Sequence, residues 1–330
     1  MVETRFSKSL GFLPIAVLLV GVLALVSISI GVYSMDWRSI LSGDGVDHTT
    51  MVLIESRVPR TVAIILAGAS LAIAGLIMQL LVRNRFVEPS LAGTTESATL
   101  GLLAVAILAP GIPIFAKMVV ASFFALVGTF VFLAILHRIP LRSPLMVPLI
   151  GIMLGGVISS VTTFFAYRHD LLQSLSAWTT GDFSSMLRGR YELLWLAGGL
   201  AILAFIASDR FTVAGMGEEF TTNLGLNYRL VMFIGMAIVA LVTAVDVVTV
   251  GAIPFLGLIV PNLVRMVMGD NARVSIPWIA VSGAAFVLLC DILGRLIRYP
   301  FNSDRKRHGG GDWKFPFPWS CSSGNHPRVS

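Results

Sequence analysis

Ionisable side chains inside long apolar runs are the residues of this sequence best placed to do chemistry. Asp246 and Asp291 each lie in such a run, where a charge must be paired, reach water or serve a function. Arg295 follows Asp291 at position i+4, a helical spacing at which the two charges neutralise each other, so we expect a structural ion pair. Asp246 has no such neighbour, and we expect it to reach water near the end of its run. Gln79 ends another run and either lines a pathway or bonds a neighbouring helix.

Two pairs of like charges mark the ends of predicted helices. Arg57 and Arg60 are spaced i and i+3, so they fall on the same side of a helix start. Glu218 and Glu219 stand at the start of a short predicted helix, where carboxylates complement the positive end of the helix dipole. Gly225 is expected to close that helix with a left-handed cap. The pattern predicts a short, rigid, capped helix.

Motifs of catalysis and metal binding are absent from the sequence. It has no histidine cluster, no His-Glu-x-x-His helix and no Gly-x-Ser-x-Gly elbow. It also lacks the Gly-x-x-x-x-Gly-Lys-Ser/Thr phosphate loop of an ATPase. Cys290 and Cys321 do not have the spacing of metal ligands. We therefore predict no catalytic residue, no metal site, no cofactor and no ATPase site in this chain.

Composition indicates which surroundings these elements need. The chain has 330 residues, of which 56% are hydrophobic and only 13% are charged, and its mean hydropathy is +0.86. A soluble domain carries about 25% charged residues, so most of this surface is expected to face lipid. The net charge of +6 is spread thinly between apolar runs, without the basic and aromatic clusters of a nucleic-acid surface. Nucleic-acid binding is therefore not expected.

Apolar runs of about 20 residues, the length that spans a bilayer, predict an all-α polytopic membrane protein. The first run is uncharged and longer than the roughly 7–15 apolar residues of a signal peptide, so it reads as a membrane span. Alternating apolar and polar residues typical of a membrane barrel are absent. Nine spans are predicted, at approximately Phe12–Val32, Thr61–Val82, Ser97–Phe115, Met118–Leu136, Leu145–Tyr167, Leu193–Ser208, Leu230–Val250, Gly251–Met268 and Ile276–Leu296.

Two segments do not read as regular spans. The segment from Gly251 to Asn262 contains Pro254 and Pro261, and each proline removes a helix donor and bends or breaks the chain. The segment 84–93 is too polar for lipid. Irregular backbone at membrane depth is tolerated where protein buries it or a wet cavity borders it. The alternative is an ordinary kinked helix and an ordinary loop.

Loop charges do not decide the orientation of the chain. With the N-terminus inside, ten Lys and Arg residues fall in cytoplasmic segments, nine in external segments and five more in an external tail. The rule that positive loops stay inside therefore does not choose between the two orientations.

Four segments of the sequence carry recognisable motifs. They are Arg57-Val-Pro-Arg60, the stretch 67–79 with its continuation 83–89, the stretch 217–225, and the stretch 251–262. In this order and spacing they resemble the iron–siderophore family of ABC importer permeases, which also includes the vitamin B12 permease. The resemblance covers about residues 57–301, and the wording of residues 86–95 is most similar to the branch for catecholate-type siderophores.

The resemblance implies a fold and a set of partners. The fold would be a ten-helix ABC importer permease of type II, in the bacterial cytoplasmic membrane, with the N-terminus inside. The partners would be a second permease subunit, identical or paralogous, two ATPase subunits that use ATP, and an extracytoplasmic siderophore-binding protein.

The resemblance also implies roles for particular residues. Arg57, Arg60 and Arg295 would dock acidic residues of the binding protein, the alternative being that they reach lipid headgroups. The segment that couples to the ATPase would include Gly217, Glu218, Glu219, Thr221, Leu224 and Gly225; the alternative is a solvated loop helix. Thr221 stands where the family usually has alanine, and a groove on the ATPase would accept its small side chain. A pathway or structural motif would include Gln79, Glu88, Pro89, Gly251, Pro254, Gly257, Pro261 and Asn262.

Two alternative functions remain open from the sequence. One is a secondary transporter driven by an ion gradient, although only Asp246 and Asp291 approach the midplane positions that such proteins use. The other is a vitamin B12 or haem importer permease of the same family.

The C-terminal segment departs from the family pattern. We divide the chain into a permease domain at residues 1–301 and a polar, basic tail at residues 302–330. The tail has no apolar run of spanning length where the family has a tenth helix, so we predict that it arose from a shift of reading frame and that it impairs the protein.

Overall fold

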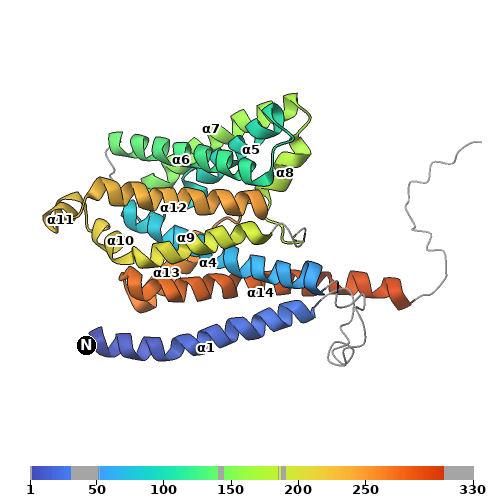
Figure 1. Ribbon diagram of the computed structural model, residues 1–330, viewed down its shortest axis with the longest axis horizontal. Coiled ribbons are helices and arrows are strands. Elements are labelled where there is room, and N and C mark those ends of the chain that lie inside the picture. Colours follow the sequence, from blue (N-terminus) through green and yellow to red (C-terminus); the bar gives the residue numbers. More distant parts are fainter. Residues whose placement is uncertain are drawn as a thin grey trace, which may run out of the picture.

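The computed structural model describes residues 2–30, 51, 53–139, 145–184, 186 and 191–307, with the side chains of residues 2–11, 137 and 298–307 left aside. In these residues the chain is helical and contains no strand (Figure 1). The α-helices are α1 (Val2–Ser29), α4 (Val58–Leu81), α5 (Thr94–Leu108), α6 (Ile114–Arg138), α7 (Met146–Arg168), α8 (Leu172–Thr179), α9 (Leu194–Ile206), α10 (Ser208–Ala214), α11 (Glu218–Asn223), α12 (Tyr228–Thr249), α13 (Leu256–Met268) and α14 (Ala272–Arg307). Short π- or 3₁₀-helical turns are η1 (Leu53–Arg57), η2 (Pro89–Leu91) and η3 (Tyr191–Leu193).

Membrane-spanning length is reached by fewer helices than the nine predicted spans. Within the described residues six helices are long and apolar enough, and a seventh is formed if η3 and α9 are joined to α10 across a 64° bend. The predicted spans Ser97–Phe115 and Gly251–Met268 correspond to α5 and α13, which have only 15 and 13 residues. The all-helical, multi-pass architecture is confirmed, whereas the count of nine full spans is not.

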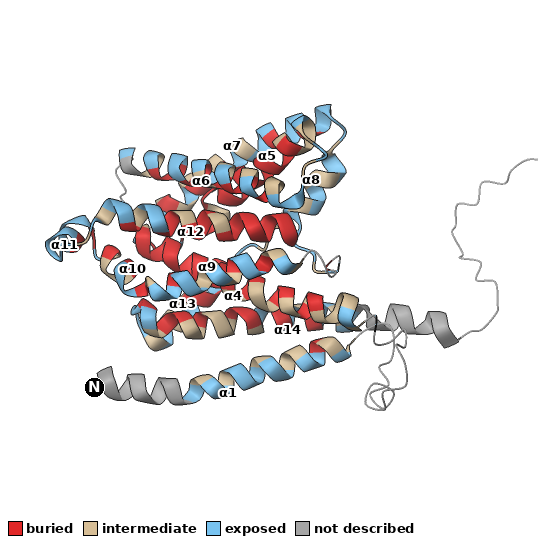
Figure 2. Cartoon of the chain, in the orientation of Figure 1, coloured by how far each residue is buried: buried red, intermediate tan, exposed pale blue. Residues whose placement is uncertain are grey.

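Helix α4 forms the centre of the bundle, and most of its residues are buried (Figure 2). Its neighbours include α9, α12, α13 and α14. Two glycines make the closest approaches possible. A Cβ added to Gly75 would lie 2.1 Å from the carbonyl oxygen of Gly257 on α13, and one added to Gly68 would lie 2.8 Å from the carbonyl oxygen of Gly283 on α14. These small residues let the backbones of three helices come into contact. Close packing of this kind holds membrane helices together, because the hydrophobic effect does not drive their association in lipid.

A break separates α12 from α13. The two prolines of this segment predicted a bend or break, but only one of them lies in it. Residues 250–255 are not helical, and α13 starts after Phe255, which has a φ of 65°. Pro254 lies in this break, but Pro261 lies inside α13 without ending it. Because Pro261 has no N–H, the carbonyl of Gly257 four residues earlier is left free. Gln79 Nε2 on α4 donates to that carbonyl at 3.1 Å.

Helix α1 lies at the edge of the bundle and packs mainly on α14 (Figure 1). Its apolar span is only 6% buried, which suits a helix that faces lipid or another subunit. Helix α14 remains helical to Arg307, six residues beyond the predicted domain boundary at 301. The rest of the predicted tail, residues 308–330, lies outside the described residues.

Candidate functional site

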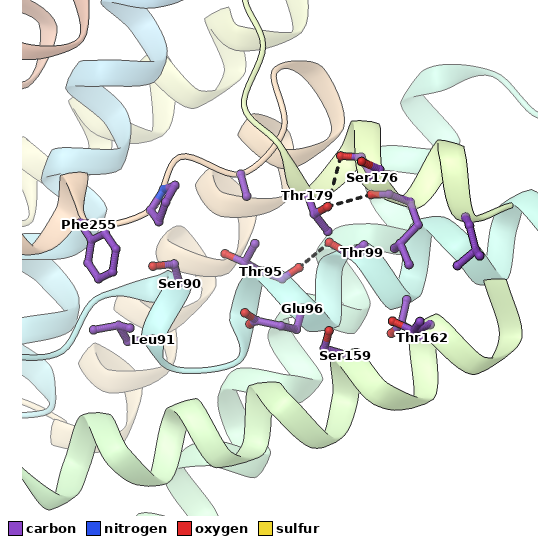
Figure 3. Close-up of a pocket in the computed structure, with 15 residues that line it drawn as sticks. Ser90, Leu91, Thr95, Glu96, Thr99, Ser159, Thr162, Ser176, Thr179 and Phe255 are labelled. Atoms are coloured by element: carbon purple, nitrogen blue, oxygen red, sulfur yellow. Dashed lines mark hydrogen bonds between the residues drawn. The ribbon is translucent and has the colours of Figure 1, made fainter. Parts of the chain in front are cut away.

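A cavity of about 550 Å³ opens between α5, α7, α8 and the turn that precedes α13 (Figure 3). Its lining is rich in hydroxyl groups, contributed by Ser90, Thr95, Thr99, Ser159, Thr162, Thr163, Ser176 and Thr179. Glu96 is the single carboxylate among its lining residues, and Glu96 Oε2 is buried without a hydrogen-bond partner. Hydroxyls both donate and accept hydrogen bonds, so the cavity suits a polar solute, and none of its described lining residues is basic.

Sequence reasoning placed only Pro254 in this cavity and missed its hydroxyl lining. A signal was present, because Thr95 and Thr99 are spaced i and i+4, and Ser159 and Thr162 are spaced i and i+3. Hydroxyls at these spacings fall on one face of a helix. Several of them also donate to the carbonyl four residues earlier, as Thr99 and Thr162 do, which satisfies the donor and leaves the lone pairs for a ligand.

Glu88 caps the N-terminus of α13 and so joins two segments far apart in sequence. Glu88 Oε1 accepts from the Phe255 N–H at 2.7 Å and from the Ser90 hydroxyl. Burial raises the pKa of the Glu88 carboxyl, and the hydrogen bonds from Ser90 and the backbone oppose that rise. A carboxylate at this place also complements the positive end of the helix dipole. Its neighbour Pro89 is buried and begins η2.

The other residues of the predicted pathway motif hold the same junction together. Asn262 Nδ2 donates to the carbonyl of Arg85 at 2.7 Å. Gln79 Oε1 accepts from Arg265 at 3.1 Å, in addition to its bond to the carbonyl of Gly257. Gly251 has a φ of 95° and sits so close to α8 that an added Cβ would lie 2.5 Å from the carbonyl oxygen of Thr180. Through these contacts the motif holds together the segments that lie beside the cavity.

The three arginines predicted to dock a binding protein converge on one place near the end of α1. Arg60 Nη2 lies 2.6 Å from Asp291 Oδ1, and Arg295 bonds the other oxygen of the same carboxylate. Arg295 also donates to the carbonyls of Ser27 and Ile30 at 2.8 and 2.9 Å. The pairing of Asp291 with Arg295 is confirmed, and Arg60 is an additional partner. We call Arg57, Arg60, Asp291 and Arg295 the arginine hub.

The arginine hub ties α1 to the bundle. Arg57 Nη1 donates to the carbonyl of Ile28 at 3.0 Å, so Arg57 and Arg295 both satisfy carbonyls at the C-terminal end of α1. Cations at that end also complement the helix dipole. Arg60 and Arg295 bring two positive charges to the single negative charge of Asp291, which leaves an excess of positive charge at this carboxylate for an acidic partner. The docking role itself stays a prediction.

The predicted coupling helix forms as α11, with Gly217 before it at a φ of 117° and Gly225 after it at 78°. Gly225 N–H bonds the carbonyl of Thr222, and Leu226 N–H bonds that of Thr221, which is the Schellman pattern of a glycine cap. Glu218 and Glu219 occupy the first turn, as predicted.

The exposed face of α11 differs from the predicted one. Thr221 is fully buried and donates to the carbonyls of Gly217 and Val213, so it does not face a groove on another protein. Leu224 is exposed, and so are Met216 and Phe220, which the sequence reasoning did not single out. Exposed apolar side chains around a short helix are typical of a protein interface.

Asp246 is buried, although the sequence predicted that it reaches water. Its side chain is 0% exposed, because the last turn of α12 is covered by α4 and by the segments around η2 and Gly251. The prediction that Asp246 reaches water is therefore wrong.

Comparison with known proteins gives consistent results. The profile of the FecCD transport family matches residues 17–304. The petrobactin import system permease protein YclN of Bacillus subtilis (strain 168) is 47% identical over 85% of this chain and 88% of its own length. The ferric-anguibactin transport system permease protein FatD of Vibrio anguillarum is 38% identical, over 83% of this chain and 87% of its own length. A solved inward-facing structure, described as a metal-chelate type ABC transporter, is 24% identical and covers 87% of this chain and 91% of its own, with a TM-score of 0.73.

Proposed function

This chain belongs to the FecCD transport family, and from that premise we propose that it is the permease subunit of an ABC importer for a ferric siderophore. It would work in the bacterial cytoplasmic membrane as a multi-pass protein. The observation that carries the proposal is the similarity, over more than four-fifths of the chain, to permeases named for petrobactin and anguibactin import. The chain would transport rather than catalyse.

The hydroxyl-lined cavity supports a role in passing a polar chelate. A permease must let its cargo leave, so many weak hydrogen bonds serve better than a few strong ionic ones. Among the residues that the structure describes, the cavity lining offers eight hydroxyl-bearing residues and no Lys or Arg side chain. An anionic ferric chelate would therefore find hydrogen-bonding partners without being trapped by an ion pair.

The exposed apolar side chains on α11 support docking of an ATPase. Phe220 and Leu224 are about half exposed, and the Gly225 cap makes α11 a rigid element. Two ATPase subunits on the cytoplasmic side would hydrolyse ATP, so that this subunit needs no cofactor of its own. A second permease subunit would complete the pathway and cover helices that now expose apolar faces.

The positive excess of Arg60 and Arg295 over Asp291 supports docking of an extracytoplasmic binding protein. Replacing Arg57 and Arg60 together by glutamate is expected to weaken co-purification of that protein, because reversal adds repulsion to a lost attraction. Unchanged co-purification from a well-expressed double variant would leave the hub a purely structural element.

The energy source for transport distinguishes an ABC importer from a carrier driven by an ion gradient. Iron uptake that depends on this chain should be inhibited by vanadate, which blocks ABC ATPases, and should resist brief treatment with an uncoupler while cellular ATP is held constant. The reverse pattern would show that an ion gradient drives transport.

A further inference from the structure

A second, much smaller chamber lies beside the hydroxyl-lined cavity. Its volume is about 20 Å³, and it is lined by the last turn of α12, the segment 88–95, and the turn 251–253. Two carboxylates, Glu88 and Asp246, line it together with the hydroxyl residues Ser90, Thr95 and Thr243. Ser90, Thr95 and Ala252 line the larger cavity as well, so the two spaces are neighbours.

Asp246 has almost no compensation for a negative charge. Its Oδ1 is buried without a hydrogen-bond partner, and its Oδ2 has only a long contact of 3.4 Å with the hydroxyl of Ser70. It also lies in the last turn of α12, at the negative end of the helix dipole. An isolated carboxylate inside a span is strongly unfavourable, so Asp246 needs either a cation beside it or a proton on its carboxyl group.

Glu88 cannot supply a positive charge to Asp246, and it does not need a cation of its own. Its own negative charge is balanced by the N–H of Phe255 and by the positive end of α13. The two carboxylates in the chamber are therefore unequal: Glu88 is already satisfied, and Asp246 is not. The chamber therefore lacks one positive charge.

We propose that the chamber binds one sodium ion, held by Asp246 Oδ1 and by the hydroxyl oxygens of Thr95 and Thr243. All the side-chain donors are oxygens, which hard cations prefer. A volume of about 20 Å³ exceeds the roughly 10–15 Å³ that one water molecule needs, so an ion of that size or smaller fits. A single missing charge favours a monovalent over a divalent ion. The junction of a helix C-terminus with unwound backbone is also where membrane proteins coordinate sodium.

The ion would fasten the break between α12 and α13. It would link α12 through Asp246 and Thr243 to the segment 88–95, which already caps α13 through Glu88. The wall shared with the larger cavity would then depend on the bound ion. This inference does not depend on the nature of the cargo, so its failure would leave the proposed function untouched.

Thermal stability of the purified full-length chain in detergent tests the proposal. Sodium chloride is titrated against choline chloride at constant ionic strength and constant pH, because an ion that binds only the folded protein raises the melting temperature in a saturable way. We expect this rise for the unaltered chain and its loss in Asp246→Asn, which is neutral without an ion.

A matched pair of threonine variants keeps the test decisive if Asp246→Asn does not fold. Thr243 and Thr162 are both buried, and each donates to the carbonyl four residues earlier. Thr243 lines the small chamber, whereas Thr162 lines only the larger cavity. Thr243→Val removes one of the proposed ligands and should weaken the apparent sodium affinity about tenfold, equivalent to about 1.4 kcal/mol of binding free energy, and Thr162→Val should leave it unchanged.

Two results would overturn the proposal. One is a melting temperature of the unaltered chain that does not distinguish sodium from choline, which would mean that Asp246 is neutralised by a proton. The other is a sodium response that is the same in the Thr243→Val and Thr162→Val variants, which would place the ion elsewhere.

Discussion

The nearly buried carboxylate of Asp291 pairs with two arginines, and Asp291→Asn tests how much this pairing stabilises the fold. The side chain is only 7% exposed, and it pairs with Arg60 and Arg295, which are 23% and 20% exposed. Asparagine keeps the shape and removes the charge. Two partly buried guanidinium groups would then share no counter-charge.

The expected cost follows from that burial. Removing one partner of a buried ion pair costs about 3–5 kcal/mol, because the other charge is left uncompensated. Here both arginines retain some solvent contact, and Arg295 keeps the carbonyls of Ser27 and Ile30. We therefore expect a loss of about 2–3 kcal/mol in the free energy of unfolding. Since Arg57 and Arg295 hold the end of α1, that helix should loosen first.

Unfolding of the purified chain in mixed detergent and sodium dodecyl sulfate measures the cost, with Asp209→Asn as the control. Asp209 pairs with Arg273 at 2.6 Å, the same distance as Asp291 with Arg60, but both partners are more than half exposed. An exposed ion pair contributes about 0–1 kcal/mol, so the control should lose much less. Equal losses for Asp291→Asn and Asp209→Asn would refute the reasoning, because burial would then make no difference.

Three further predictions concern other parts of the chain. Gly75→Ala places a Cβ 2.1 Å from a carbonyl oxygen of α13 and should sharply lower the amount of folded protein in the membrane, whereas Gly199→Ala, with nothing within 4 Å, should not; equal yields would contradict the close packing. Replacing Glu218 and Glu219 by lysine puts positive charge at the positive end of α11 and should abolish stimulation of the ATPase by the binding protein; normal stimulation would mean that α11 is only a solvated helix. Translating the same DNA in the other two frames beyond codon 301 should reveal an apolar stretch of about 20 residues, and its absence from both frames would end the frameshift explanation.

Local signals in the sequence predicted the local features of the fold. The pairing of Asp291 with Arg295 and the glycine cap at Gly225 depend on residues within one or two turns of each other, so spacing alone indicates them. Long uncharged runs likewise predicted the long spans. The predicted span Ser97–Phe115 was too long because α5 ends at Leu108. The Pro110-Gly111 pair lies in that run, and the residue before a proline is disfavoured in a helix. The pair therefore ends the helix although the run remains apolar beyond it.

Features that depend on distant segments were not predictable in the same way. Arg60 reaches Asp291 across 231 residues of sequence, and no local pattern places them together. The burial of Asp246 follows from packing of α12 against α4 and the segment around η2, not from its own neighbours in sequence. The hydroxyl-lined cavity also assembles from three α-helices, η2 and the turn before α13. Its residues showed helical spacing, but only the tertiary arrangement brings their faces together.

Uptake of radioactive iron supplied as a panel of ferric siderophores tests the central claim most directly. The comparison is between a strain that lacks this chain and the same strain that expresses it together with its partner subunits. A further arm expresses a version that carries the predicted apolar helix in place of residues 302–330. We predict that uptake from a complex of the petrobactin or anguibactin kind is lost in the deletion and recovers on expression, more fully with the version that carries the predicted helix, while uptake of free ferrous iron does not change. Undiminished uptake of every ferric siderophore in the deletion strain, with no other importer for them present, would contradict the account.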